Sequence, residues 1–151
     1  MKKSAIAFLS AVSAALLVQT AAAIPPEAVA IGPVAPGMTE TALLAACGEP
    51  LQKAGDTWIY QNFRVEFDDD RPAIVEEVET TSVAVATPAG VRVGQPFSAL
   101  EAAYGAPDKI DPGDHTTDEY EYFTPDRTMK LEVEVLKGRG LIVELSCKLE
   151  D

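Results

Sequence analysis

Gly37-Met-Thr-Glu-Thr-Ala-Leu-Leu-Ala-Ala-Cys-Gly-Glu-Pro50 is repeated in altered form as Gly94-Gln-Pro-Phe-Ser-Ala-Leu-Glu-Ala-Ala-Tyr-Gly-Ala-Pro107. Seven of the fourteen positions are identical at a constant offset of 57 residues, and the identities include both glycines and the final proline. Such self-similarity is typical of a supersecondary unit that has been duplicated. The sequence therefore predicts two repeats, covering residues 37–86 and 90–151.

Two further pairs of segments continue the repeat in the same order. Trp58-Ile-Tyr60 corresponds to Tyr120-Glu-Tyr122, and Ile74-Val-Glu76 corresponds to Ile142-Val-Glu144. The offset grows to 62 and then to 68 residues. The additional residues therefore fall between the predicted elements, where loops tolerate insertions.

Each repeat is predicted to begin with a short helix. In the first repeat, Thr39 is placed to cap the amides that follow it. In the second, Ser98 and Glu101 form the pattern of a capping box. Both helices are predicted to end at a glycine, Gly48 or Gly105, because glycine adopts positive φ readily and a proline two residues later prevents continuation.

Strand patterns follow each predicted helix. Apolar and charged residues alternate through 63–67 and 131–135, which is typical of a sheet with one packed and one solvated face. The aromatic segments 58–60 and 120–122 and the segments 73–79 and 141–148 complete three strands per repeat. The predicted fold class is α+β: two tandem units, each a helix plus a three-stranded antiparallel sheet. The two sheets can also join into one continuous sheet with the helices on one face.

The amino-terminal region has the pattern of an export signal. Lys2 and Lys3 precede the apolar stretch 4–18, and Ala21-Ala-Ala23 supplies a cleavage motif. We expect residues 1–23 to be removed as a signal peptide, giving a periplasmic or secreted protein with no transmembrane segment in the mature chain. Residues 24–36 carry four prolines and are predicted to form an extended, Pro-rich tether.

The mature chain is predicted to be strongly acidic and poor in cysteine. Without Lys2 and Lys3 it has ten basic and 24 acidic residues, a net charge of −14. This charge argues against nucleic acid and anionic lipid as partners, because proteins bind both through basic surfaces. Cys47 and Cys147 are predicted to face the core, and whether they form a disulfide is left open because it depends on the distance between their Cα atoms.

The first repeat resembles the SmpA/OmlA family. The resemblance rests on the Gly-Met-Thr segment 37–39, the Gly-x-Pro segment 48–50 and the Trp-x-Tyr segment 58–60, and the second repeat is a diverged version. The family includes the BamE-like accessory lipoprotein of the outer-membrane β-barrel assembly machinery. Two such units in tandem are also similar to the secreted β-lactamase-inhibitor protein. The resemblance implies a role in outer-membrane assembly or, as the alternative, inhibition of an extracellular hydrolase such as a β-lactamase.

Few residues offer catalytic or metal-binding chemistry. The weak candidates for a metal site are Asp111, Asp114, His115 and Asp118, which share one loop and offer ligands that suit Ca²⁺ or Zn²⁺. Their spacing matches neither an EF-hand nor a zinc motif, so a solvated loop is expected and no cofactor is predicted. No serine lies in a nucleophile-elbow motif. The sequence therefore favours a protein that is not an enzyme.

Two groups of residues are candidates for protein–protein contact. They are Trp58, Tyr60, Tyr120 and Tyr122 on the predicted strands, and Asp68, Asp69 and Asp70 at a predicted hairpin tip. The aromatic rings are anchors for a partner if their face of the sheet is exposed, and core residues if a helix covers it. The acidic tip is either a site for a basic partner or a solvated turn. We expect an exported, non-catalytic interaction module of the cell envelope, whose partner is another envelope protein or an extracellular enzyme.

Overall fold

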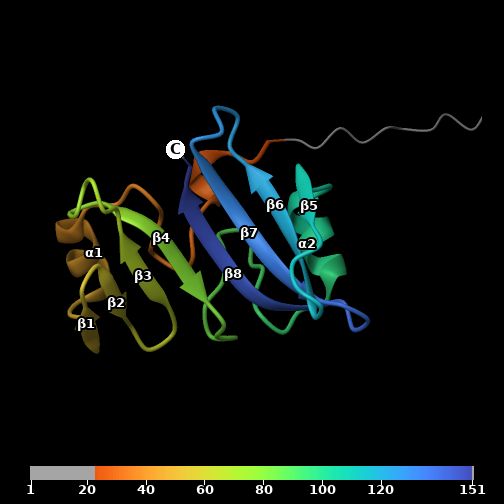
Figure 1. Cartoon of the computed structure of the whole chain (residues 1–151), viewed down its shortest axis with the longest axis horizontal. Helices are drawn as coiled ribbons and strands as arrows, with labels where there is room; N and C mark the ends of the chain where they lie inside the picture. Colours follow the sequence, from red (N-terminus) through yellow and green to blue (C-terminus); the bar gives the residue numbers. More distant parts are fainter. Residues whose placement is uncertain (1–22, 151) are drawn as a thin grey trace, which may run out of the picture.

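The computed structural model describes residues 23–150, which form one eight-stranded antiparallel sheet with two short helices (Figure 1). The strands are Gln52–Ala54 (β1), Thr57–Ile59 (β2), Arg64–Phe67 (β3), Val75–Thr80 (β4), Lys109–Asp111 (β5), Thr117–Phe123 (β6), Met129–Leu136 (β7) and Leu141–Leu149 (β8). Their order in the sheet is β1-β2-β3-β4-β8-β7-β6-β5. The predicted signal peptide lies outside the described residues except for Ala23.

Two helices of eight residues, α1 (Glu40–Cys47) and α2 (Phe97–Tyr104), each precede four of the strands. Thr39 caps α1 as predicted, because its side-chain oxygen accepts a hydrogen bond from the Ala42 amide at 3.2 Å. The predicted helix ends are also confirmed. Gly48 and Gly105 follow the two helices with φ values of 73° and 74°.

The predicted fold class is wrong in its layout. The chain does not form two units of one helix and three strands, but a single sheet in which each helix is followed by four strands. The unpredicted strands, β1 and β5, occupy the two edges of the sheet. Both are three residues long and largely exposed, so they lack the alternation of buried and exposed residues that marks a longer strand. The two halves meet where β4 pairs with β8.

One face of the sheet packs against both helices. Trp58, Val65, Val78, Cys147, Leu131 and Tyr122 are partners in successive strand pairs, so their side chains share one face. All six are buried, and Leu43 of α1 and Leu100 of α2 belong to the same core cluster. The opposite face of the sheet is left without a helix (Figure 1).

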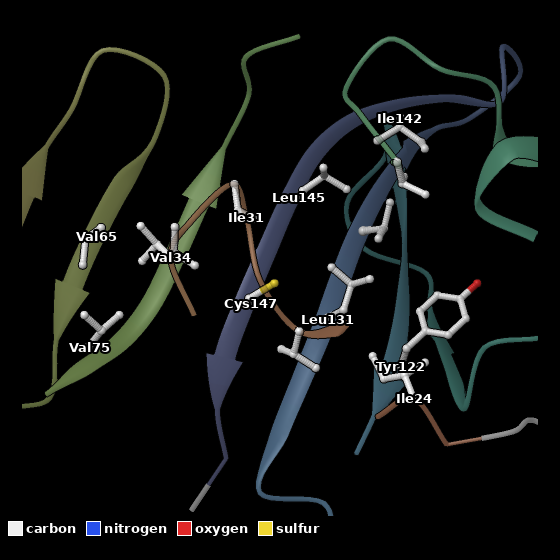
Figure 2. Packing of buried hydrophobic residues seen from close by; sticks show 14 of the residues in the cluster. Ile24, Ile31, Val34, Val65, Val75, Tyr122, Leu131, Ile142, Leu145 and Cys147 are labelled. Atoms are coloured by element: carbon white, nitrogen blue, oxygen red, sulfur yellow. The ribbon is translucent and has the colours of Figure 1, made fainter. Parts of the chain in front are cut away.

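Residues 24–36 pack into the core instead of forming the predicted tether. Val29, Ile31 and Val34 are fully buried and Ile24 is 4% exposed. Ile31 and Val34 lie beside β4 and the Cys147 side chain, and Ile24 lies beside Tyr122 (Figure 2). The Ile24 amide donates a hydrogen bond to the Phe123 carbonyl at 3.0 Å. We call residues 24–36 the strap; it includes a 3₁₀ turn, Pro26–Ala28, and covers the middle of the sheet between α1 and α2.

Both cysteines are free thiols. Cys147 is fully buried, as its position in the strand predicted, whereas Cys47 is only partly buried against the core. Burial raises the pKa of both thiols above the ordinary value. Within residues 23–150, no helix is long and apolar enough to cross a membrane.

Candidate functional site

The four aromatic candidates lie on the helix-covered face of the sheet. Trp58 and Tyr60 are 6% and 8% exposed, and Tyr122 is fully buried. Tyr120 is partly buried and packs on Phe97 of α2, with ring centroids 4.6 Å apart. The structure therefore places Trp58, Tyr60 and Tyr122 in the core, where a partner protein does not reach them.

The acidic tip is a structured turn in which Asp68 is engaged internally. Its carboxylate accepts hydrogen bonds from Arg71 Nε at 2.8 Å and Nη2 at 2.5 Å, and from the backbone amides of Asp70 and Arg71. The Arg71 guanidinium and these amides lower the pKa of Asp68. Asp69 and Asp70 are exposed and project from the turn.

The aspartates that were weak candidates for a metal site, in the loop that contains His115, each bind a different partner. The Asp114 carboxylate accepts hydrogen bonds from the hydroxyl and the amide of Thr116, both at 2.6 Å, and from the amide of Thr117. These hydrogen bonds lower the pKa of Asp114 to about 2. Asp111 pairs with Lys109, and Asp118 pairs with Lys137. Within residues 23–150, no group of three or more His, Cys, Asp or Glu side chains is arranged to hold a metal ion.

The face of the sheet opposite the helices, which we call the open face, carries three rows of side chains. Each row consists of residues that are direct partners in the strand register. The first row is Phe123, Lys130, Lys148, Glu77, Glu66 and Thr57; the second is Lys109, Glu121, Glu132, Ser146, Glu79, Arg64 and Ile59; the third is Asp111, Glu119, Glu134 and Glu144. The open face is therefore dominated by carboxylates.

Lysine and arginine side chains neutralise much of the first two rows. Lys130 Nζ lies 2.9 Å from a Glu121 oxygen and 3.0 Å from a Glu132 oxygen. Lys148 Nζ lies 3.1 Å from Glu132 and 3.6 Å from Glu77. Burial by itself would raise the pKa of Glu132, but the two lysines outweigh it and the pKa is lowered. These rows thus form a connected network of ion pairs.

The third row has no such compensation. We call Asp111, Glu119, Glu134 and Glu144 the carboxylate ladder. Asp111 pairs with Lys109 at the sheet edge, but the side chains of the other three form no hydrogen bond or ion pair with any residue in 23–150. Each faces another carboxylate directly across the strand pair. Like charges in such positions repel and destabilise a sheet.

The electrostatic consequence appears in the pKa values of the ladder. Burial raises the pKa of Glu144 to about 7, and repulsion from Glu79, Glu134 and Glu77 adds to the effect. Burial also raises the pKa of Glu119, with repulsion from Glu132 and Glu134. Clusters of perturbed carboxylates are more frequent at functional sites than elsewhere.

Sequence reasoning missed the ladder as a candidate site. The alternation of glutamate with apolar residues at 131–135 correctly predicts a solvated face, but it does not say which glutamates stand opposite one another. That information lies in the register between β5, β6, β7 and β8, which places residues as far apart in the chain as Asp111 and Glu144 in one row. A row of in-register charges is visible only once the strands are paired.

Comparisons with known proteins show what the fold is similar to. The sequence matches no protein-family model and no curated protein. The structure is similar to that of a DUF4309 family protein (YjgB) from Bacillus subtilis, with a TM-score of 0.55 and 17% identity over 85% of this chain and 88% of that one. Two further structures have 10% identity to this chain.

The first of these is an extracellular protein containing a SCP domain from Bacillus anthracis, with a TM-score of 0.50 over 99% of this chain and 50% of that one. The second is a cysteine-rich secretory protein from Staphylococcus aureus, with a TM-score of 0.51 over 83% of this chain and 48% of that one. This chain therefore spans about half the length of these two proteins. At such low identities, the three likenesses establish the fold alone.

Proposed function

We propose that this protein is an exported, non-catalytic interaction module that binds a basic partner protein through the open face of its sheet. The observation that carries the proposal is the carboxylate ladder. Three of its four carboxylates form no ion pair with any residue in 23–150, and they lie on the face that the helices and the strap leave uncovered. A partner that presents lysine or arginine side chains to this face relieves the repulsion between them.

Export is supported by two separate observations. The sequence has a basic and apolar leader that ends in an Ala-x-Ala motif. Two of the proteins with a similar fold are described as an extracellular protein and a secretory protein. We propose on this basis that the partner is a protein of the cell envelope, as the SmpA/OmlA resemblance implies.

The test is capture of the partner by matched variants of the chain. The ladder variant carries Glu119→Gln, Glu134→Gln and Glu144→Gln. The control variant carries Glu27→Gln, Glu49→Gln and Glu101→Gln, which remove the same amount of charge. Glu27 lies in the strap, Glu49 lies just after α1, and Glu101 lies in α2. Wild type and control are expected to retain the same partner from the native envelope, and the ladder variant to lose it.

A competitor establishes that the contact is electrostatic and specific to the open face. A soluble oligolysine peptide should release the partner, whereas a glycine-serine peptide of equal length should not. Retention of the partner by the ladder variant would refute the proposal. If the captured protein is a hydrolase whose activity falls on binding, the module is an inhibitor and the assembly role is excluded.

A further inference from the structure

We propose that the carboxylate ladder is a proton-sensitive element, in which Glu144 takes up a proton as the medium turns from neutral to mildly acidic, and that this uptake stabilises the sheet and lowers the negative charge of the open face. The inference goes beyond the proposed function and does not depend on the identity of a partner.

Glu144 lies where negative charge converges from both neighbouring strands. On β7, Glu134 is its direct register partner. On β4, Glu79 and Glu77 are the partners of Ser146 and Lys148, so their side chains lie on the same face as Glu144. Three carboxylates thus act on Glu144 from the two strands that pack beside it.

Among the described residues, Lys148 is the cation whose charge lowers the pKa of Glu144, and it already forms ion pairs with other residues. Lys148 lies four residues further along β8 and forms ion pairs with Glu132 and Glu77. Its charge lowers the pKa of Glu144, but burial and the three carboxylates outweigh it and hold the pKa at about 7. Protonation removes one of two opposed charges in the Glu134–Glu144 pair, which relieves the repulsion across β7 and β8.

The sign of the stability effect follows from proton linkage. An unfolded chain holds glutamate at its ordinary pKa of about 4.3, so it releases this proton at a lower pH than the folded chain does. Between that value and about 7, the folded state binds more protons than the unfolded state. Stability therefore falls as pH rises through this window and recovers on acidification, until carboxylates held in ion pairs are themselves protonated.

The experiment is a titration of the glutamate carboxyl carbons by NMR on the purified chain, with Glu144 assigned by comparison with Glu144→Gln. We expect the Glu144 signal to titrate near neutral pH. Glu134→Gln should lower that midpoint toward ordinary glutamate, because it removes one of the three carboxylates that repel Glu144. The control, Glu101→Gln on exposed α2, should leave it unchanged.

Thermal unfolding of the same proteins gives an independent readout. The midpoint of the wild type should rise when the pH is lowered from about 8, above the pKa of Glu144 in the folded chain, to about 5.5, which lies between the two pKa values. Glu144→Gln should unfold at a higher temperature than wild type at the upper pH, with a smaller dependence on pH. Titration of Glu144 at the ordinary glutamate pKa, equal shifts from Glu134→Gln and Glu101→Gln, or an unaltered pH dependence in Glu144→Gln would each overturn the proposal.

Discussion

At the scale of single residues, two tyrosines hold the helix ends in the same way. The Tyr60 hydroxyl donates a hydrogen bond to the Gly48 carbonyl, and the Tyr122 hydroxyl donates to the Gly105 carbonyl, both at 3.1 Å. Each bond ties the residue that ends a helix to a strand beneath it. The recurrence of a tyrosine at positions 60 and 122 is therefore explained by the attachment of each helix end to the sheet.

Removal of the Tyr122 hydroxyl should destabilise the fold. Tyr122→Phe removes this part-buried hydrogen bond to the Gly105 carbonyl, which we expect to reduce the free energy of unfolding by about 1 kcal/mol. Tyr120→Phe is the matched control, because no hydrogen bond involves the Tyr120 hydroxyl among residues 23–150; its effect should stay within about 0.5 kcal/mol. Urea denaturation measures both, and equal effects would contradict the proposed role of the bond.

Asp114 should organise the loop between β5 and β6. Asp114→Ala removes the acceptor for the Thr116 and Thr117 amides, so hydrogen exchange at these amides should accelerate. Because the pKa of Asp114 is lowered to about 2, its contribution is present above the ordinary aspartate pKa and is lost as the pH falls through about 2. Asp70→Ala, in a different turn, should leave the exchange of both amides unchanged.

At the scale of elements, the strap is the part of the chain that joins the two halves of the core. It places apolar side chains between α1 and α2 over the seam where β4 meets β8. A three-residue 3₁₀ turn is its longest regular element, so its position is fixed by packing and by a few backbone hydrogen bonds. The strap is therefore expected to contribute to stability as a core element does.

Truncation of a buried strap residue tests this view. Ile31→Ala should reduce the free energy of unfolding by about 2–5 kcal/mol, because the Ile31 side chain is fully buried and its truncation leaves a cavity in the core. Pro33→Ala changes an exposed residue of the same segment, and its effect should be below about 1 kcal/mol. Denaturation by urea compares the two. A tether that only spaces the domain from its amino terminus would give small effects for both.

At the scale of the whole molecule, the sheet separates an apolar face from a charged one. The helices and the strap share the apolar face, and the three rows of the other face hold nine carboxylates and four basic side chains. Salt screens the repulsion between exposed charges on one face. The distance over which it does so, the Debye length, is about 10 Å at 0.1 M ionic strength and about 3 Å at 1 M. Ionic strength should therefore act on stability through the open face.

Salt should raise the melting temperature at a pH where the ladder is ionised. We expect sodium chloride to stabilise the wild type and the variant with Glu27, Glu49 and Glu101 changed to Gln to similar extents. The variant with Glu119, Glu134 and Glu144 changed to Gln should gain less, because its repulsion is already removed. Scanning calorimetry over a range of salt concentrations measures the three gains. Equal gains would show that the stabilisation comes from overall net charge instead.

The sequence by itself determined the local features of this protein. Thr39 capped α1 and Gly48 and Gly105 ended the helices because these effects act within a few residues. The longer strands followed from apolar alternation. Tertiary structure decided the start of α2. Ser98 does not cap this helix, which begins at Phe97. The Phe97 amide donates a hydrogen bond to the Gly140 carbonyl at 2.7 Å.

Tertiary structure also decided the edge strands, the burial of the strap and the carboxylate ladder. The edge strands and the strap are held by neighbours distant in sequence, and their own residues carry too little pattern to reveal those neighbours. The glutamates of the ladder were visible in the sequence as a solvated face. Their opposition is a property of strand register, which no single strand encodes.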